Sequence, residues 1–139
     1  MSTNIRAELS QSNPYWVERH RYYELKHFCL QYPMWKRAYA LIDGLQSAQM
    51  DTNGCVRSGE TADPTPKIAE VLTYYSDRIR MVEETARKAS PDLGVYILRG
   101  VTQAMTYEQL NARIRVPCCR DVYYETYRRF FWLLDKARK

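Results

Sequence analysis

The stretch from Thr106 to Arg138 reads TYEQLNARIRVPCCRDVYYETYRRFFWLLDKAR and decides the fold of this 139-residue chain. Thr106 and Gln109 have the spacing of a capping box, in which a hydroxyl and an amide each satisfy a free backbone N–H at a helix start. A short helix is therefore predicted from about Tyr107. Pro117 suits the first turn of a longer second helix, because a proline loses no hydrogen bond there. Helix, tight turn and basic helix are the outline of a DNA-binding helix-turn-helix.

The second helix of this motif is expected to bury one face and expose the other. Its buried face is predicted from side chains that recur at helical spacing, namely Val122, Thr126, Phe130, Leu133 and Ala137. In a recognition helix, the first turns reach base edges while flanking Lys and Arg side chains hold phosphates. We therefore expect base contacts from Arg120 and Tyr124, with Tyr123 beside them. The remaining DNA contacts are expected from Arg113, Arg115, Arg128, Arg129 and Lys136.

The turn departs from the usual helix-turn-helix pattern. A small residue commonly follows the apolar residue of the first helix, and a glycine commonly stands in the turn. Here Asn111 and Arg115 occupy those places. The interval from Val116 to Val122 is also one residue longer than usual. The sequence therefore leaves the geometry of the turn open.

The positive charge of the chain is concentrated in this motif. The net charge is +5, and residues 100–139 carry eight Lys or Arg against four Asp or Glu, a balance of +4. Residues 1–50 and 51–99 have balances of +2 and −1. Clustered basic side chains are typical of a phosphate-contacting surface, and a solvated basic helix is the alternative.

Two helices rich in aromatic residues are predicted before the motif, over residues 13–45. Asn13-Pro14 reads as a helix start, and Pro33 disfavours helical geometry at Tyr32, so one helix should end there and a second should begin. The two helices are expected to form an aromatic hairpin. The buried positions predicted for it are Val17, Tyr22, Leu25, Phe28, Cys29, Tyr32, Trp35, Tyr39, Ile42 and Leu45. Residues 1–12 are expected to form a flexible N-terminus.

A loop or linker is predicted over residues 46–64, with Cys55 exposed, because the segment holds glycines and turn formers and little to bury. Residues 65–139 then form the long helix and the helix-turn-helix unit. The long helix has a heptad seam made of Ile68, Leu72, Tyr75, Ile79 and Val82. Such a seam either packs within the chain or joins copies, so a homodimer is one alternative. Ser90-Pro91 starts a brief helix that closes near Gly100. The expected fold is all-α: a helical hairpin, a long heptad helix and a C-terminal helix-turn-helix.

Catalytic and metal-binding patterns are absent from the sequence. His20 and His27 are the only histidines, and Cys118 and Cys119 are adjacent, so neither pair has the spacing of a structural zinc site. We find no phosphate-binding glycine loop and no nucleophile or metalloprotease motif. No enzyme activity, cofactor or metal is therefore predicted. Neither a signal segment nor a membrane span is indicated, and reduced thiols place the protein in the cytoplasm.

Three segments carry a resemblance to a known group of proteins. They are YYELKHFCLQYPMWK (22–36), DPTPKIA (63–69) and VPCCRDVYYETYRRFFWLL (116–134). The chain resembles small proteins encoded by phages and prophages of Gram-positive bacteria. Its C-terminal part is similar to RinA/ArpU-type late transcription regulators and to sigma-factor region 4. The resemblance implies double-stranded DNA as the ligand, near promoters, and host RNA polymerase as a further partner.

The expected function is that of a phage-type transcriptional regulator that binds DNA through its C-terminal motif in the host cytoplasm. Two alternatives stay open. A small terminase-like DNA-packaging subunit would also combine a helix-turn-helix with an oligomerising helix. A phage inhibitor of a host enzyme or defence complex would instead use the aromatic hairpin as its partner surface.

Overall fold

The computed structural model describes residues 13–52 and 66–138, with the backbone alone for 46–52. This part of the chain contains helices and no strand, which confirms the all-α class. The predicted flexible N-terminus, most of the predicted loop and Cys55 lie outside the described residues. The helices are α1 (Arg19–Leu30), α2 (Tyr32–Thr52), α3 (Pro66–Ala89), α4 (Gly94–Thr102), α5 (Tyr107–Ile114) and α6 (Arg120–Ala137).

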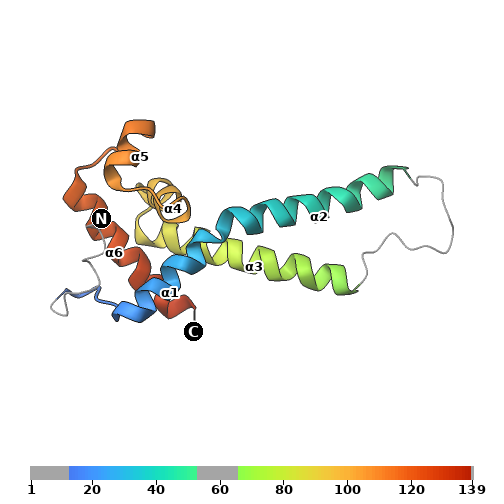
Figure 1. Ribbon diagram of the computed structural model, residues 1–139, viewed down its shortest axis with the longest axis horizontal. Helices are drawn as coiled ribbons and strands as arrows, with labels where there is room; N and C mark the ends of the chain where they lie inside the picture. The colour runs from blue at the N-terminus through green and yellow to red at the C-terminus, as the bar shows by residue number, and fades with distance from the viewer. Residues whose placement is uncertain (1–12, 53–65, 139) are drawn as a thin grey trace.

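The helices divide into a head and an arm (Figure 1). The head contains α1, α4, α5, α6 and the C-terminal part of α3. The arm consists of α2 and the rest of α3, which run side by side away from the head. Within the described ranges, no helix combines the length and the apolar character needed to cross a bilayer.

Helix α1 starts later than the sequence predicts. Asn13 caps only a turn, through its side-chain oxygen and the Tyr15 N–H. The helix begins at Arg19, where the Glu18 carboxylate accepts hydrogen bonds from the N–H groups of His20 and Arg21. A carboxylate at this place also interacts favourably with the helix dipole.

The hairpin of the fold is formed by other helices than expected. Helices α1 and α2 are separated only by Gln31 and meet at their junction, where the rings of Phe28 and Trp35 pack edge to face at 4.8 Å. Helix α2 instead packs along α3. It also continues to Thr52, beyond the predicted end at Leu45. The predicted buried positions of α1 are correct, whereas Leu45 is 58% exposed.

The heptad seam of α3 is used inside the chain. Val82 is fully buried, and Tyr75 and Ile79 are half-buried against the core. Ile68 and Leu72 continue the same stripe along α2 and are half-buried. Since α2 already occupies this stripe, the predicted oligomerisation through these five residues is replaced by packing within one chain.

Helix α6 is the central element of the head and contacts α1, α3, α4 and α5. Its buried side chains are Tyr123, Tyr124, Tyr127, Phe130, Phe131 and Leu134. The hydroxyls of Tyr127 and Tyr22 in α1 form a buried hydrogen bond of 2.7 Å. Burial raises the pKa of Tyr127 far above its usual value. This aromatic core fixes the position of the turn before α6.

Candidate nucleic-acid interface

Helix α5 has the predicted start. Thr106 accepts a hydrogen bond from the Gln109 N–H at 3.2 Å, and the Gln109 side chain accepts one from the Thr106 N–H at 3.0 Å. The capping box is therefore confirmed. Leu110 holds the helix in the core, since its side chain is fully buried.

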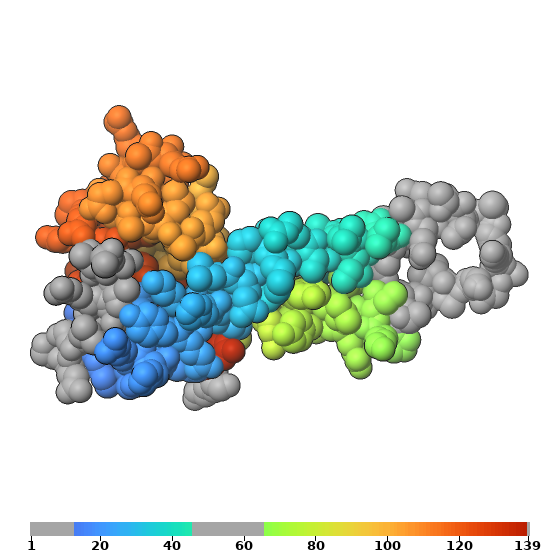
Figure 2. All heavy atoms as spheres, viewed as in Figure 1, coloured from blue at the N-terminus to red at the C-terminus, as the bar shows by residue number. Residues whose placement is uncertain are grey.

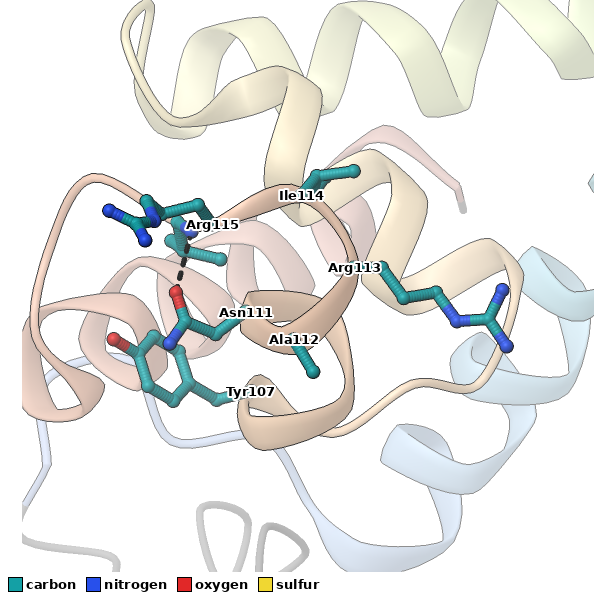
Figure 3. A pocket seen from close by; sticks show the side chains of 7 residues that line it. Tyr107, Asn111, Ala112, Arg113, Ile114 and Arg115 are labelled. Carbon is teal, nitrogen blue, oxygen red and sulfur yellow. Dashed lines mark hydrogen bonds between the residues drawn. The ribbon is translucent and has the colours of Figure 1, made fainter.

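The turn between α5 and α6 takes the form that a glycine ordinarily allows. Arg115 has φ 54°, a backbone conformation that L side chains rarely adopt. It ends α5 by donating its N–H to the Asn111 carbonyl at 2.9 Å. The Asn111 side-chain oxygen accepts the next N–H, from Val116, at 2.8 Å (Figure 3). The two residues that depart from the usual pattern thus build the turn together.

The second helix starts three residues after Pro117, at Arg120, with Cys119 as its N-cap. Pro117 lies in the turn itself. The Tyr107 hydroxyl spans the turn and donates a hydrogen bond to the Cys118 carbonyl at 2.6 Å. The turn is therefore held to α5 at both of its ends.

The predicted buried face of α6 is wrong by about one position. Val122 is 45% exposed, although it was expected inside. Tyr123 and Tyr124 are buried instead, with exposed fractions of 0% and 8%. Neither tyrosine can therefore reach a DNA base. The Tyr124 hydroxyl accepts a hydrogen bond from the Tyr107 N–H at 3.0 Å, which makes it part of the α5–α6 contact.

Arg120 is also engaged within the protein. Its Nε lies 3.0 Å from a carboxylate oxygen of Glu108 in α5, and its guanidinium lies 5.3 Å from the centre of the Tyr124 ring. The expected base contact from Arg120 would require this exposed ion pair to open. Exposed ion pairs contribute little stability, about 0–1 kcal/mol, so the opening costs little.

The other predicted contact residues fall into two groups. Arg113 and Arg115 are exposed, and no carboxylate pairs with either in the described residues. They line an open hollow at the end of α5 and point to opposite sides of it (Figure 3). Arg129 packs near the Tyr15 ring and Lys136 lies 4.3 Å from the Trp132 ring, so both are held by aromatic neighbours. Arg128 is half-buried, and its Nε is enclosed without a hydrogen-bond partner.

The exposed surface of the first turns of α6 is of mixed character. Val122 stands between Asp121 and Glu125, and all three side chains are exposed. Sequence reasoning did not select these residues, because Val122 looked like a core position and the carboxylates oppose phosphate binding. Helical spacing from Tyr123 and Tyr127, had they been assigned to the core, would have placed Val122 and Glu125 outside.

No group of three or more His, Cys, Asp or Glu side chains that could hold a metal ion occurs in the described ranges. Comparisons of the chain with family models, with curated proteins and with solved structures give no match.

Proposed function

We propose that this chain is a phage-type transcriptional regulator that binds double-stranded DNA through the helix-turn-helix of α5 and α6. The observation that carries the proposal is Arg115, an exposed and unpaired arginine held at positive φ in the turn. A left-handed conformation costs an L residue about 1–2 kcal/mol, and such strain is concentrated at functional sites. An arginine in place of glycine supports a role for its charge at this position.

The proposed DNA-binding surface differs from the one expected from sequence. Arg113 and Arg115 would hold phosphates on the two sides of the turn, because both are free to do so. Val122 would contact a thymine methyl group, and Glu125 would accept a hydrogen bond from a cytosine amino group. Tyr123 and Tyr124 have no part in it. Host RNA polymerase remains a proposed further partner, and the protein would act in the host cytoplasm without a cofactor.

Arg115→Gly tests the proposal with two opposed readouts. Glycine should relieve the strained conformation and raise the free energy of unfolding by about 0.5–1 kcal/mol. Loss of the charge should weaken binding to all DNA sequences and reduce the dependence of binding on salt. Fluorescence anisotropy on duplexes selected from phage genomic fragments, at two salt concentrations, measures the binding.

Two control variants complete this experiment. Ala104→Gly relieves a second non-glycine residue at positive φ, with φ 55°, and should raise stability without changing DNA binding. Arg80→Ala removes an exposed arginine from the arm and should leave binding unchanged. Equal affinities of the wild type and Arg115→Gly would contradict the proposal.

A terminase-like packaging subunit would use the same DNA surface. Mass photometry separates this alternative from a regulator, since a closed ring of many subunits would favour packaging. A second candidate function is inhibition of a host protein. Asp121 and Glu125 around the exposed Val122 favour it, because two carboxylates repel phosphates and suit a basic protein surface. Binding that survives Arg113→Ala and Arg115→Ala but is lost in Val122→Asp would support this second function.

A further inference from the structure

The arm carries an exposed apolar stripe in addition to the one that packs against α3. Along α2, the residues Met34, Ala38, Leu41 and Leu45 recur at spacings of four, three and four. Met34, Leu41 and Leu45 are 46%, 64% and 58% exposed. These spacings place the four residues on one side of the helix, next to the side that buries Trp35. Such a stripe is typical of a helix that packs against a further helix.

Helix α3 adds to the same surface of the arm. A polar hollow marks one side of the arm and is lined by Lys36, Tyr39, Ala40, Ser76, Ile79, Arg80 and Glu83. Helical spacing then places Leu41 and Leu45 of α2, and Val71 and Tyr74 of α3, on the other side. Tyr74 is 49% exposed, and the guanidinium of Arg78 lies 3.5 Å from its ring centre. We call Met34, Leu41, Leu45, Val71 and Tyr74 the arm face.

The arm extends away from the head, as the space-filling view shows (Figure 2). The side chains of the arm face therefore lack cover from the head, and α2 packs only against α3 along most of its length. A pair of helices buries too little apolar surface to be stable by itself, and four helices are the usual solution. The arm face supplies the missing contact.

The charges at the two edges of the arm face indicate what covers it. Beyond the α2 stripe stands Arg37, which is exposed and forms no ion pair in the described residues. Beyond Tyr74, α3 carries Glu70, Asp77 and Glu84 at intervals of seven residues. One edge is therefore basic and the other acidic. A two-fold axis along the arm brings the α2 edge of one copy opposite the α3 edge of another, so the surface is complementary to itself.

We propose that the arm face binds the arm face of a second copy of this chain, so that two arms form a parallel four-helix bundle with both heads at one end. This inference goes beyond DNA binding and is tested without DNA. It also has a consequence for the proposed function, because two heads at one end suit two half-sites on a duplex.

The replacement of Leu41 and Leu45 by Asp tests the dimer. Sedimentation velocity of the full chain over a wide concentration range should show a dimer for the wild type. The double variant should dissociate at least about 100-fold more readily, because each buried leucine contributes about 1.5–3 kcal/mol. Its circular dichroism should be unchanged, since both side chains are exposed in the single chain. Ala40→Asp, on the polar side of α2, is the matched control and should remain a dimer.

A charge reversal tests the parallel arrangement. Arg37→Glu should weaken the dimer roughly fivefold, and Arg37→Glu combined with Glu84→Lys should restore it. Tighter association of Arg37→Glu alone would overturn the parallel arrangement, because it would indicate that α2 faces α2. A wild-type chain that stays monomeric, or a Leu41 and Leu45 double variant that stays dimeric, would overturn the whole inference. Failure of DNA binding in a chain that still dimerises would count only against the proposed function.

Discussion

At Gly100 in α4, the absence of a side chain makes room for Tyr123 of α6. A Cβ atom built on Gly100 would lie 2.2 Å from the Tyr123 hydroxyl oxygen. Gly100→Ala should therefore lower the free energy of unfolding by about 1–3 kcal/mol, as overpacking of a core does. Urea denaturation of the variant measures the change.

Tyr123→Phe provides the matched partner for this substitution. The Tyr123 hydroxyl is buried and has no hydrogen-bond partner in the structure, so its removal should cost little stability. Gly100→Ala and Tyr123→Phe together should be more stable than Gly100→Ala alone. If the double variant is as unstable as the sum of the two single changes, the close contact is not the cause.

The thiols of the head should differ strongly in reactivity. Cys29 is fully buried, and burial raises the pKa of its thiol. Cys118 is half-exposed, and its pKa is also raised, mainly by burial. Cys119 is exposed. Because the thiolate is the reactive form, alkylation at mildly alkaline pH should modify Cys119 first, Cys118 later and Cys29 only after unfolding. Peptide mass spectrometry assigns each site, and early labelling of Cys29 would contradict its place in the core.

At the scale of single elements, the orientation of α6 decides which residues can act. The two assignments of its buried face predict opposite effects of mutation. With the observed face, Val122→Ala should change the free energy of unfolding by less than about 0.5 kcal/mol. Leu134→Ala, at a fully buried position, should lower it by about 2–5 kcal/mol. Thermal or urea unfolding of both variants is sufficient, and the reverse order of costs would favour the face predicted from sequence.

The signals that sequence analysis identified correctly are local ones. The capping box of α5 depends only on Thr106 and Gln109, and the short helix after Ser90 starts with a hydrogen bond from the Leu93 N–H to the Ser90 hydroxyl. Such bonds form between residues close in the chain, so spacing alone identifies them. The buried positions of α1 were correct for a related reason, since one stripe there is plainly more apolar than the rest.

The orientation of α6 could not be settled in the same way. Val122, Phe130 and Leu133 satisfy helical spacing, and so do Tyr123, Tyr127, Phe130 and Leu134. Tyrosine suits both a core and a DNA surface, so composition does not choose between the two stripes. Contacts with Tyr22 and Gly100, which are distant in sequence, decide the matter. The partner of α2 is likewise decided by a distant segment.

At the scale of the whole molecule, head and arm differ in how their helices are covered. In the head, α6 is surrounded by four helices, whereas in the arm each helix packs mainly against one other. Backbone amides of the arm should therefore exchange hydrogen faster than those in the middle of α6. Hydrogen–deuterium exchange with mass spectrometry measures both regions in one sample.

Dimerisation would change this pattern in one region only. If the arm face binds a second copy, exchange in residues 34–45 and 66–78 should slow as protein concentration rises. The double variant of Leu41 and Leu45 should show fast exchange there at every concentration, while the amides of α6 keep their wild-type rates. Equal acceleration in α6 would point to a general loss of stability instead.

The C-terminal end of α6 is tied to α1 through Arg21. The Nε of this arginine lies 2.6 Å from Asp135, and its terminal nitrogens contact Glu24 and the backbone carbonyls of Asp135 and Arg138. Arg138 in turn lies 3.6 Å from Glu24 and over the Phe28 ring. For expression of this protein, an affinity tag therefore belongs after Lys139 behind a flexible spacer, and shortening the chain by a few codons would remove a clasp between its first and last helices.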